Sequence, residues 1–519
     1  MLTFLAPVDY ATAGYPAGGP FSAVAAGDFA NNGIRDLAVA GYSSVSVLLG
    51  NGDGTFQQAH TYDTGGINTA SVAVGDLTGD GKLDIVTAND GYGYDGGYHY
   101  FPAVPGSVSV LMGNGDGTFQ APLNITLPGV GSPVSVALGD MNHDGRLDAV
   151  VTVATSSGYD YVDVLLGHGD GTFSIGSTTQ LGFYGAQSVE LGDFSGDGNL
   201  DVATVDPGAN DVAVLKGNSD GTLAAPTYFA TGAAPQSLAV GDVNGDGKLD
   251  LVTANYNYGN LSGNGGSVSV LLGNGDGSFQ PPDNIALPPW TPPGYSGVNP
   301  LPLAQSPRAV VMGDLNGDGK MDLAVTATSS YSRYIGSGYY GIKNYAFITK
   351  STVNVLLGNG DGNFTEAQIV PLDTVNSPAS IVAGNFNGDN FPDLAVEDSN
   401  SGSVSVLMNA ADWSPPTPPP SGFSVSGFPS SITAGVPGNF TVTALNADGT
   451  VDTAYTGTVS FTSSDGQAAL PGVYQFTSGD AGVHTFSATL KTAGTQSITA
   501  SYGTATGSET QISVTPAGA

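Results

Sequence analysis

Cysteine is absent from this chain of 519 residues, and basic residues are scarce. Without cysteine, no disulfide bond can stabilise the fold and no thiol can take part in redox chemistry. Lys and Arg together number 11 against 45 Asp and Glu, so the formal net charge is −34 at pH 7. Nucleic acids and anionic membrane surfaces attract proteins through Lys and Arg. The composition therefore argues against both as partners.

Long apolar runs are also missing. No stretch approaches the roughly 20 residues that a membrane-spanning helix needs, so we expect no insertion into a membrane. The first residues, Met1 to Phe4, show neither the basic start nor the apolar run of a signal peptide. The composition is nevertheless typical of secreted proteins, and we expect a secreted, extracellular or cell-surface location.

Glycine is abundant, with 78 residues, and Thr, Ser, Val and Tyr are frequent, which suits β-strands joined by many turns. One ten-residue stretch, GDLTGDGKLD from Gly75 to Asp84, returns along the chain. Four further copies are close to it, at residues 139–148, 192–201, 241–250 and 313–322, and two weaker copies lie at 27–36 and 384–393. We call these seven stretches the acidic loops and number each from the residue after its first glycine.

Each strong copy has oxygen-bearing side chains at positions 1, 3, 5 and 9 and glycine at position 6. Hard cations such as Ca²⁺ take about six to eight oxygen ligands, and glycine permits the backbone dihedrals of so tight a loop. Position 7 is expected to offer its backbone carbonyl oxygen. We therefore predict Ca²⁺ as the cofactor, with five strong sites and up to seven in all. The expected metal ligands are Asp28, Asn32, Asp36, Asp76, Thr78, Asp80, Lys82, Asp84, Asp140, Asn142, Asp144, Arg146, Asp148, Asp193, Ser195, Asp197, Asn199, Asp201, Asp242, Asn244, Asp246, Lys248, Asp250, Asp314, Asn316, Asp318, Lys320, Asp322, Asn385, Asn387, Asp389 and Asp393.

A tight turn without metal is the alternative, because Asp, Asn and Gly also form ordinary Asx turns. Five near-complete copies favour the metal, since carboxylates packed this closely repel one another strongly. An EF-hand is excluded, because position 12 holds Thr87 or Thr253 where that loop needs Glu, and β-type runs replace its helices. The two weak copies carry fewer charges, with Ala30 at position 3 of the first and Asn385 at position 1 of the last. They should bind metal weakly or not at all.

The acidic loops recur every 48 to 72 residues, so the repeating unit has about fifty residues plus insertions. Each unit shows four β-type runs, two around the acidic loop and two around a second turn such as Gly-Asn-Gly-Asp-Gly at 113–117. Seven such units predict an all-β fold with a seven-bladed β-propeller over residues 1–411. The last unit lacks its fourth strand, and residues 4–10 match the fourth strands of other units. We expect these residues to complete the last blade and close the ring.

The acidic motif resembles the FG-GAP or VCBS repeat, the blade of the integrin α-subunit propeller and of many secreted bacterial proteins. The resemblance covers about four fifths of the chain. It implies Ca²⁺ in the acidic loops.

A proline-rich linker at residues 412–421 is expected to form a semi-rigid polyproline II spacer. Residues 422–519 show six or seven alternating runs with turn signals between them, which predicts an immunoglobulin-like β-sandwich. Within this region, residues 433–450 and 480–501 resemble bacterial Ig-like, distantly filamin-like modules. We expect this domain to act as a spacer or stalk.

Strand parity places the loops of each blade at two ends. The turns that join strands 1 and 2 and strands 3 and 4 lie at one end, so the acidic loops should share one face. The loops that join strands 2 and 3 (2–3 loops), and those that join strand 4 to the next unit (4–1 loops), should lie on the other face. The insertions 89–106, 255–266, 284–306 and 328–351 fall in the second group, as loops rich in aromatic residues and glycine. Such loops often build binding surfaces; alternatively, these side chains pack on one another and only cover the ring. The expected ligand-binding residues are Tyr92, Tyr94, Tyr98, His99, Tyr100, Tyr256, Tyr258, Trp290, Tyr295, Tyr334, Tyr339 and Tyr340.

Two functions fit these features. The first is a calcium-binding adhesion or recognition protein whose aromatic face binds carbohydrate or a surface protein. The second is a polysaccharide-active enzyme of the lyase type, which needs a base such as Tyr or His beside a cation. His99 and Arg333 lie in the insertions, but no short motif fixes a base beside a cation. We therefore name no catalytic residue and favour the first function.

Overall fold

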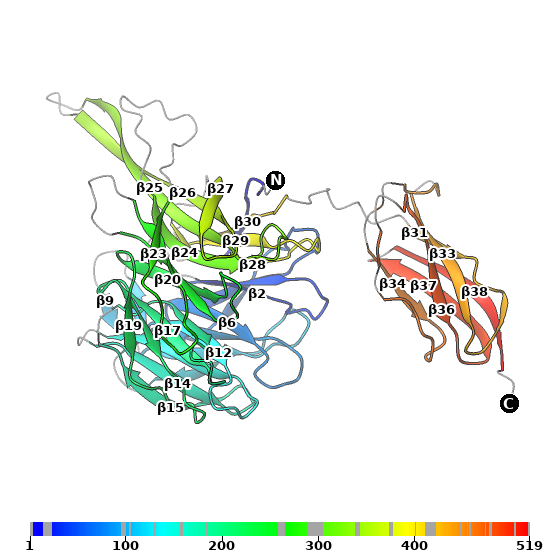
Figure 1. The fold of residues 1–519 in the computed structure, drawn as a ribbon, viewed down its shortest axis with the longest axis horizontal. Helices are drawn as coiled ribbons and strands as arrows, with labels where there is room; N and C mark the ends of the chain where they lie inside the picture. Colours follow the sequence, from blue (N-terminus) through cyan, green and yellow to red (C-terminus); the bar gives the residue numbers. More distant parts are fainter. Residues whose placement is uncertain are drawn as a thin grey trace. The chain divides into compact units, whose positions relative to one another are not determined.

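The computed structural model describes residues 4–13, 23–94, 100–102, 105–127, 131–155, 159–182, 185–257, 265–287, 305–337, 343–372, 377–399, 401–410, 422–446, 449–453, 455, 458–472, 474–476, 480–502 and 505–516. These residues form strands, turns and bends; they contain no α-helix, and so no helix that could cross a membrane. The chain divides into two compact units, Met1–Asp412 and Trp413–Ala519 (Figure 1).

The first unit contains, within these ranges, seven four-stranded antiparallel sheets. Sheet 1 comprises β2 (Val24–Gly27), β3 (Asp36–Ala40), β4 (Ser44–Leu48) and β5 (His60–Asp63), and sheet 2 comprises β6 (Thr69–Gly75), β7 (Asp84–Asn89), β10 (Ser107–Leu111) and β11 (Leu123–Thr126). Sheet 3 comprises β12 (Gly131–Gly139), β13 (Asp148–Thr155), β14 (Tyr161–Gly167) and β15 (Phe173–Gln180), and sheet 4 comprises β16 (Val189–Gly192), β17 (Asp201–Asp206), β18 (Asp211–Leu215) and β19 (Thr227–Ala230).

The remaining three sheets follow the same order. Sheet 5 comprises β20 (Pro235–Gly241), β21 (Asp250–Asn255), β22 (Ser267–Leu271) and β23 (Asp283–Ala286), and sheet 6 comprises β24 (Ser306–Gly313), β25 (Asp322–Ser337), β26 (Lys343–Gly358) and β27 (Phe364–Leu372). Sheet 7 comprises β28 (Pro378–Gly384), β29 (Asp393–Asp398), β30 (Ser403–Leu407) and β1 (Val8–Ala11), which is the N-terminal strand of the chain.

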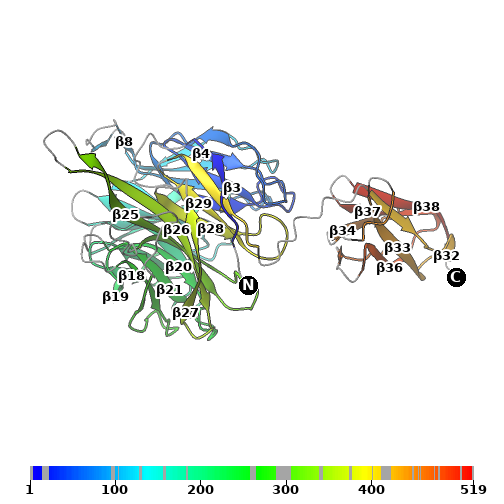
Figure 2. The same ribbon diagram turned by 90° about the horizontal axis from the view of Figure 1, so that it is seen from above.

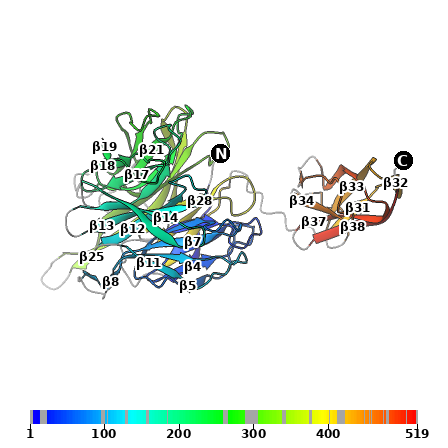
Figure 3. The ribbon, with the colours of Figure 1, turned by 90° about the horizontal axis from the view of Figure 1, so that it is seen from below.

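The seven sheets form a closed, propeller-like ring. Their first strands contact one another in the order β2, β6, β12, β16, β20, β24, β28 and back to β2. Among the described residues, seven apolar clusters each join two neighbouring sheets, so every interface of the ring has its own core. Second strands such as β7 and β21 are buried along their whole length, whereas fourth strands such as β5 and β19 are largely exposed. Figures 2 and 3 show the sheets following one another in chain order, from blue to yellow.

The N-terminal strand closes the ring, as the sequence predicts. β1 pairs antiparallel with β30, with Val8 opposite Val406 and Ala11 opposite Ser403. Leu5 N donates to Met408 O over 2.9 Å, which extends the pairing beyond the strand. The first residues of the chain therefore supply the fourth strand of the last sheet.

A central channel with a volume of about 550 Å³ runs between the first strands of all seven sheets. Serine side chains beside the channel link neighbouring sheets. Each serine hydroxyl oxygen accepts a hydrogen bond from a backbone N–H in the first strand of the next sheet. These pairs are Ser71 with Val136 N (3.3 Å), Ser135 with Val189 N (3.3 Å), Ser237 with Val310 N (3.4 Å) and Ser380 with Val24 N (3.3 Å). Glu190 and Arg308 are the charged residues among the described residues that line the channel. Burial raises the pKa of Glu190 to about 7.

Two insertions between second and third strands form hairpins. Between β7 and β10 of sheet 2, β8 (Tyr92–Tyr94) pairs with β9 (Tyr100–Pro102) as a separate two-stranded sheet. In sheet 6, β25 and β26 remain paired from Leu323–Leu356 out to Ser337–Lys343, with a bulge between Tyr334 and Gly336. This pair extends well beyond the ring (Figures 1 and 2). The expectation of a loop over 328–351 is therefore wrong: the backbone continues the ladder of sheet 6, and only the tip at 338–342 lies outside the described residues.

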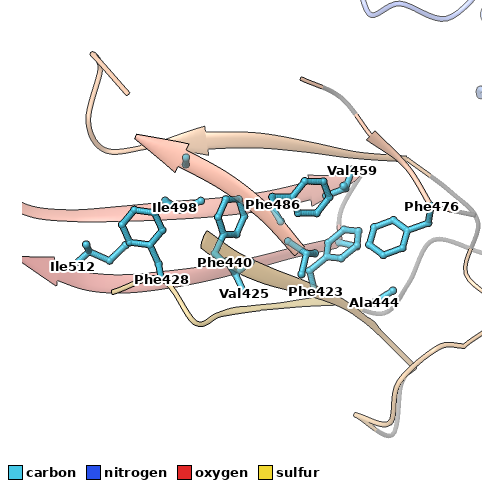
Figure 4. Close-up of a cluster of buried hydrophobic side chains, with 14 of the residues drawn as sticks. Phe423, Val425, Phe428, Phe440, Ala444, Val459, Phe476, Phe486, Ile498 and Ile512 are labelled. Carbon is cyan, nitrogen blue, oxygen red and sulfur yellow. The ribbon is translucent and has the colours of Figure 1, made fainter. Parts of the chain in front are cut away.

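The second unit consists of two facing sheets. One contains β31 (Gly422–Ser426), β33 (Pro437–Leu445) and β36 (Val483–Thr489); the other contains β32 (Ser431–Thr433), β38 (Ala505–Thr515), β37 (Gly494–Tyr502), β34 (Thr458–Ser463) and β35 (Tyr474–Gln475). Both sheets contribute to one aromatic core, in which Phe440 lies between Phe428 and Phe486 (Figure 4). The sequence runs anticipate six of these strands and miss the short β32 and β35. The assignment to an immunoglobulin-like class stays a prediction.

Removing residues 1–12 is expected to open the ring, because β30 would then present an unpaired backbone edge. The shortened chain should aggregate and melt at a lower temperature than the parent, which size-exclusion chromatography and calorimetry measure. A chain that lacks residues 413–519 instead is the control, since it keeps all seven sheets. If removal of β1 leaves solubility and melting temperature unchanged, this strand is not what holds the ring closed.

Candidate functional site

The acidic loops lie between the first and second strands, and the residue at position 1 closes each of them. Asp76 Oδ1 accepts from Gly79 N over 2.8 Å, and Asp76 Oδ2 accepts from Gly81 N over 2.8 Å. Gly81 has a φ of 80°, which confirms that position 6 requires the left-handed region. In the last loop Asn390 takes this position with a φ of 91°. These are the hydrogen bonds of an Asx-type turn.

In six of the seven loops, position 5 carries an aspartate that accepts the backbone N–H of position 7, and Asn32 takes this place in the first loop. Asp80 Oδ1 accepts from Lys82 N over 3.0 Å, and Lys82 Nζ lies 2.8 Å from Asp80 Oδ2. The same pairing joins Lys248 Nζ to Asp246 at 3.5 Å. These pairs are solvent-exposed, so they contribute little to stability. They do supply an internal counter-charge that a bound cation would have to displace.

Position 9 has a different role from the other loop positions. Its aspartate is at most 1% exposed in all seven loops, and its two oxygens accept N–H groups from two separate segments. One donor lies in the acidic loop, and the other begins the turn after the third strand or, in sheet 7, is Asn409. We call these seven residues the latch aspartates. They are Asp36 (Phe29 N 2.8 Å, Gly50 N 2.8 Å), Asp84 (Leu77 N 3.0 Å, Gly113 N 2.8 Å), Asp148 (Met141 N 2.9 Å, Gly167 N 2.8 Å), Asp201 (Ser195 N 2.9 Å, Gly217 N 2.8 Å), Asp250 (Val243 N 2.9 Å, Gly273 N 2.7 Å), Asp322 (Leu315 N 3.0 Å, Gly358 N 2.9 Å) and Asp393 (Phe386 N 2.9 Å, Asn409 N 2.8 Å).

The latch bonds place the acidic loops and the second turns at the same end of each sheet, as strand parity predicts. Burial raises the pKa of every latch aspartate, and the other carboxylates of the same loop raise it further. For Asp84 these neighbours are Asp76 and Asp80, and for Asp393 the pKa reaches about 7. Each loop therefore holds a buried negative charge that its neighbours disfavour.

The donor set of the acidic loops suits a hard cation, because it consists of carboxylate, amide and hydroxyl oxygens. In the five strong loops each latch oxygen accepts one N–H and keeps a second lone pair, whereas Asp36 Oδ2 in the first loop accepts from both Phe29 N and Ala30 N. Within the described residues, however, no three Asp, Glu or His side chains converge closely enough to hold a metal. The structure thus brings positions 1, 5 and 9 into one loop, and metal binding there stays a prediction.

On the opposite face, the structure describes only some of the expected ligand-binding residues. Tyr92, Tyr94, Tyr100 and Tyr334 lie in the two hairpins, where the backbone alone is described. Tyr98, His99, Tyr258, Trp290, Tyr295, Tyr339 and Tyr340 lie outside the described residues. Tyr256 directly follows β21, and the Arg308 guanidinium carbon lies 4.8 Å from the centre of its ring. Arg308 was not among the expected residues, because 52 positions separate it from Tyr256 and no local motif joins the two.

Comparison with solved structures gives distant likenesses only. A lectin of Agrocybe aegerita that recognises non-reducing terminal N-acetylglucosamine is 20% identical, with a TM-score of 0.43 over 77% of this chain and 96% of that chain. A periplasmic gluconolactonase of Pseudomonas aeruginosa is 15% identical, with a TM-score of 0.45 over 74% and 98%. An exotype rhamnogalacturonan lyase is 13% identical, with a TM-score of 0.41 over 78% and 76%. No curated protein sequence matches the chain.

Comparison with protein families is more informative. The FG-GAP-like repeat matches residues 28–87, 100–151, 193–253, 260–325 and 341–396, and the FG-GAP repeat matches residues 68–111. The first set of matches spans more than half of the chain and follows the sheets of the ring. The chain therefore belongs to the FG-GAP-like repeat family.

Proposed function

We propose that this protein is a calcium-binding recognition protein, secreted or exposed at the cell surface, that binds carbohydrate at one end of its propeller-like ring. The observation that carries this proposal is the separation of two chemistries. The acidic loops lie at one end of the sheets, and the long hairpins of sheets 2 and 6 extend from the other. A rigid all-β ring thus presents an aromatic-rich set of insertions away from its charged loops.

Carbohydrate is the ligand class that best suits this composition. Tyr and Trp offer a flat apolar face and one polar tip, so they can stack on a sugar ring while they hydrogen-bond a hydroxyl. The two hairpins contribute tyrosines at Tyr92, Tyr94, Tyr100 and Tyr334. The net charge of −34 disfavours polyanionic polymers and favours glycans that are neutral or cationic overall. A surface protein that carries such a glycan would meet the same requirements.

Calcium is proposed for the five strong acidic loops. Each carries acidic residues at positions 1, 5 and 9. Burial raises the pKa of the latch aspartate, and the carboxylates at positions 1 and 5 raise it further at Asp84, Asp148, Asp250 and Asp322. A divalent cation near these carboxylates would offset their repulsion. The resulting gain in stability belongs to the folded state only, because the loop does not exist in the unfolded chain.

Chelation is expected to lower the melting temperature, since a ligand that binds only the folded state stabilises it by mass action. Calorimetry in excess EDTA, followed by re-addition of Ca²⁺, measures this effect. Mg²⁺ at the same concentration is the control and should restore less, because it demands a smaller, near-octahedral site. Elemental analysis that finds no calcium, together with a melting curve unaffected by EDTA, would contradict the proposal.

The ligand face is tested by shortening the hairpin of sheet 6. Ser329 and Lys350 are cross-strand partners, so residues 330–349 can be replaced by an Asn-Gly turn without disturbing the ring. The shortened chain should lose binding on a glycan array and keep its melting temperature. Asp246→Asn on the opposite face is the control and should keep binding.

Retention of glycan binding by the shortened chain would place the ligand elsewhere. The same glycans should also be followed by ultraviolet absorbance. Unsaturated products of base-catalysed elimination would show that the protein is a lyase instead of a binding protein.

A further inference from the structure

The channel mouth on the hairpin side is formed by one layer of residues from the first strands. Each first strand ends in a glycine. In five of the seven sheets, a β-bulge occurs in the first strand, and its extra residue lies five positions before that glycine. Bulges re-aim a side chain, and the six residues of this layer that the structure describes line the channel. Three neighbouring sheets place polar residues there, Gln187, Gln236 and Arg308, whereas sheets 7, 2 and 3 place Ala379, Ala70 and Val134. The mouth is thus polar on one side and apolar on the other.

Arg308 carries a charge that its described surroundings do not neutralise. Among the residues that the structure describes, no carboxylate lies within ion-pair distance of it, and its Nε is buried without a hydrogen-bond partner. Glu190, the other charged residue of the channel, lies three residues deeper along the strands, which is about 10 Å. A partly buried guanidinium without an anionic partner is costly in a protein. In a chain with a net charge of −34, an unpaired arginine at this position needs an explanation beyond packing.

The arginine is also held in place. Its guanidinium stacks on the ring of Tyr256 at 4.8 Å. Tyr256 itself is fixed by its backbone, because Tyr256 N donates to Ala234 O over 2.9 Å. Gln305, three residues before Arg308 in the chain, is fully buried, and its side-chain nitrogen donates to Asn354 Oδ1 over 2.8 Å. The cation therefore lies at the channel mouth on a rigid support, as binding groups usually do.

We propose that Arg308, with Gln187, Gln236 and Tyr256, binds the single carboxylate of an acidic sugar, a uronic acid, at the end of an otherwise neutral glycan. Arginine recognises a carboxylate through parallel N–H donors, and Gln187 can bond a neighbouring hydroxyl group. Gln236 lines the site, and its side-chain nitrogen donates to Ala234 O (3.1 Å) and Pro235 O (3.4 Å). Tyr256 and the alanines across the mouth offer apolar contact for the sugar ring. One cation surrounded by neutral groups suits one carboxylate, and not a polyanion or a phosphate dianion. This inference rests on the proposed function, and it adds which sugar the site selects.

The test uses the full chain and saturation-transfer NMR with methyl glucuronide and, separately, methyl glucoside. The parent should show saturation transfer to the glucuronide and much less to the glucoside. Arg308→Gln should weaken glucuronide binding about tenfold or more, the loss expected for a hydrogen-bonded charge. Arg35→Gln, at an exposed position of the first acidic loop that is not an expected metal ligand, makes the same charge change and should leave binding unchanged. Calorimetry of each variant separates loss of binding from loss of folding.

A second variant keeps the test decisive if Arg308→Gln does not fold. Gln236→Glu places a carboxylate in the same layer on the neighbouring strand, and it should abolish glucuronide binding without removing the arginine. Equal binding of both sugars by the parent, or unchanged glucuronide binding in both variants, would overturn the proposal. If neutral glycans bind the hairpin face while the glucuronide does not depend on Arg308, the proposed function stands and this inference falls. If instead the glucuronide depends on Arg308 while no neutral glycan binds the hairpin face, the inference about Arg308 stands and the hairpin face is not the binding face.

Discussion

The buried carboxylate at the end of each acidic loop is the constraint on which the ring depends. Asp250, for example, accepts one N–H from Val243 in the acidic loop and one from Gly273 in the second turn. Two connections of the same sheet are thereby tied to one side chain that water does not reach. Hydrogen bonds to a charged acceptor are worth about 1.5–3 kcal/mol each, and a buried donor left without a partner costs a similar amount. Because the same hydrogen bonds occur in every sheet, the acidic motif has a structural role in each blade whether or not it binds a ligand.

Much of this fold follows from the sequence. The seven copies of the motif, the four strands of each unit and the closing strand at residues 4–10 were all accessible from repeat spacing and turn residues. The latch was not, because a sequence shows that Asp84 carries oxygens but not whether backbone N–H groups or a cation will occupy them. The sequence predicts a loop where sheet 6 has its hairpin, since the Ser, Tyr and Gly residues there suit turns as well as strands. Arg308 and Tyr256 meet only because sheets 5 and 6 are neighbours, and no local pattern encodes that contact.

The same architecture separates the acidic loops from the long insertions. The latch aspartates and acidic loops occupy one end of the sheets, where variation would disturb the turns that hold each blade. Insertions between second and third strands extend from the other end, where they lengthen an existing ladder and leave the interfaces between sheets intact. The apolar clusters between sheets are untouched by such insertions. A ring of this kind can therefore change its insertions while its core stays constant.

The latch account is tested most directly by comparing Asp250→Asn with Asp246→Asn, each with Ca²⁺ and in excess EDTA. Asparagine at position 250 would turn one acceptor into a donor that faces a backbone N–H, so we expect a loss of about 2–4 kcal/mol. The melting temperature of Asp250→Asn should therefore fall in both conditions. Asp246 is exposed, and its variant should differ from the parent only when Ca²⁺ is present. If Asp250→Asn melts with the parent in EDTA and is destabilised only in Ca²⁺, position 9 is a metal ligand and not a latch, and the account is contradicted.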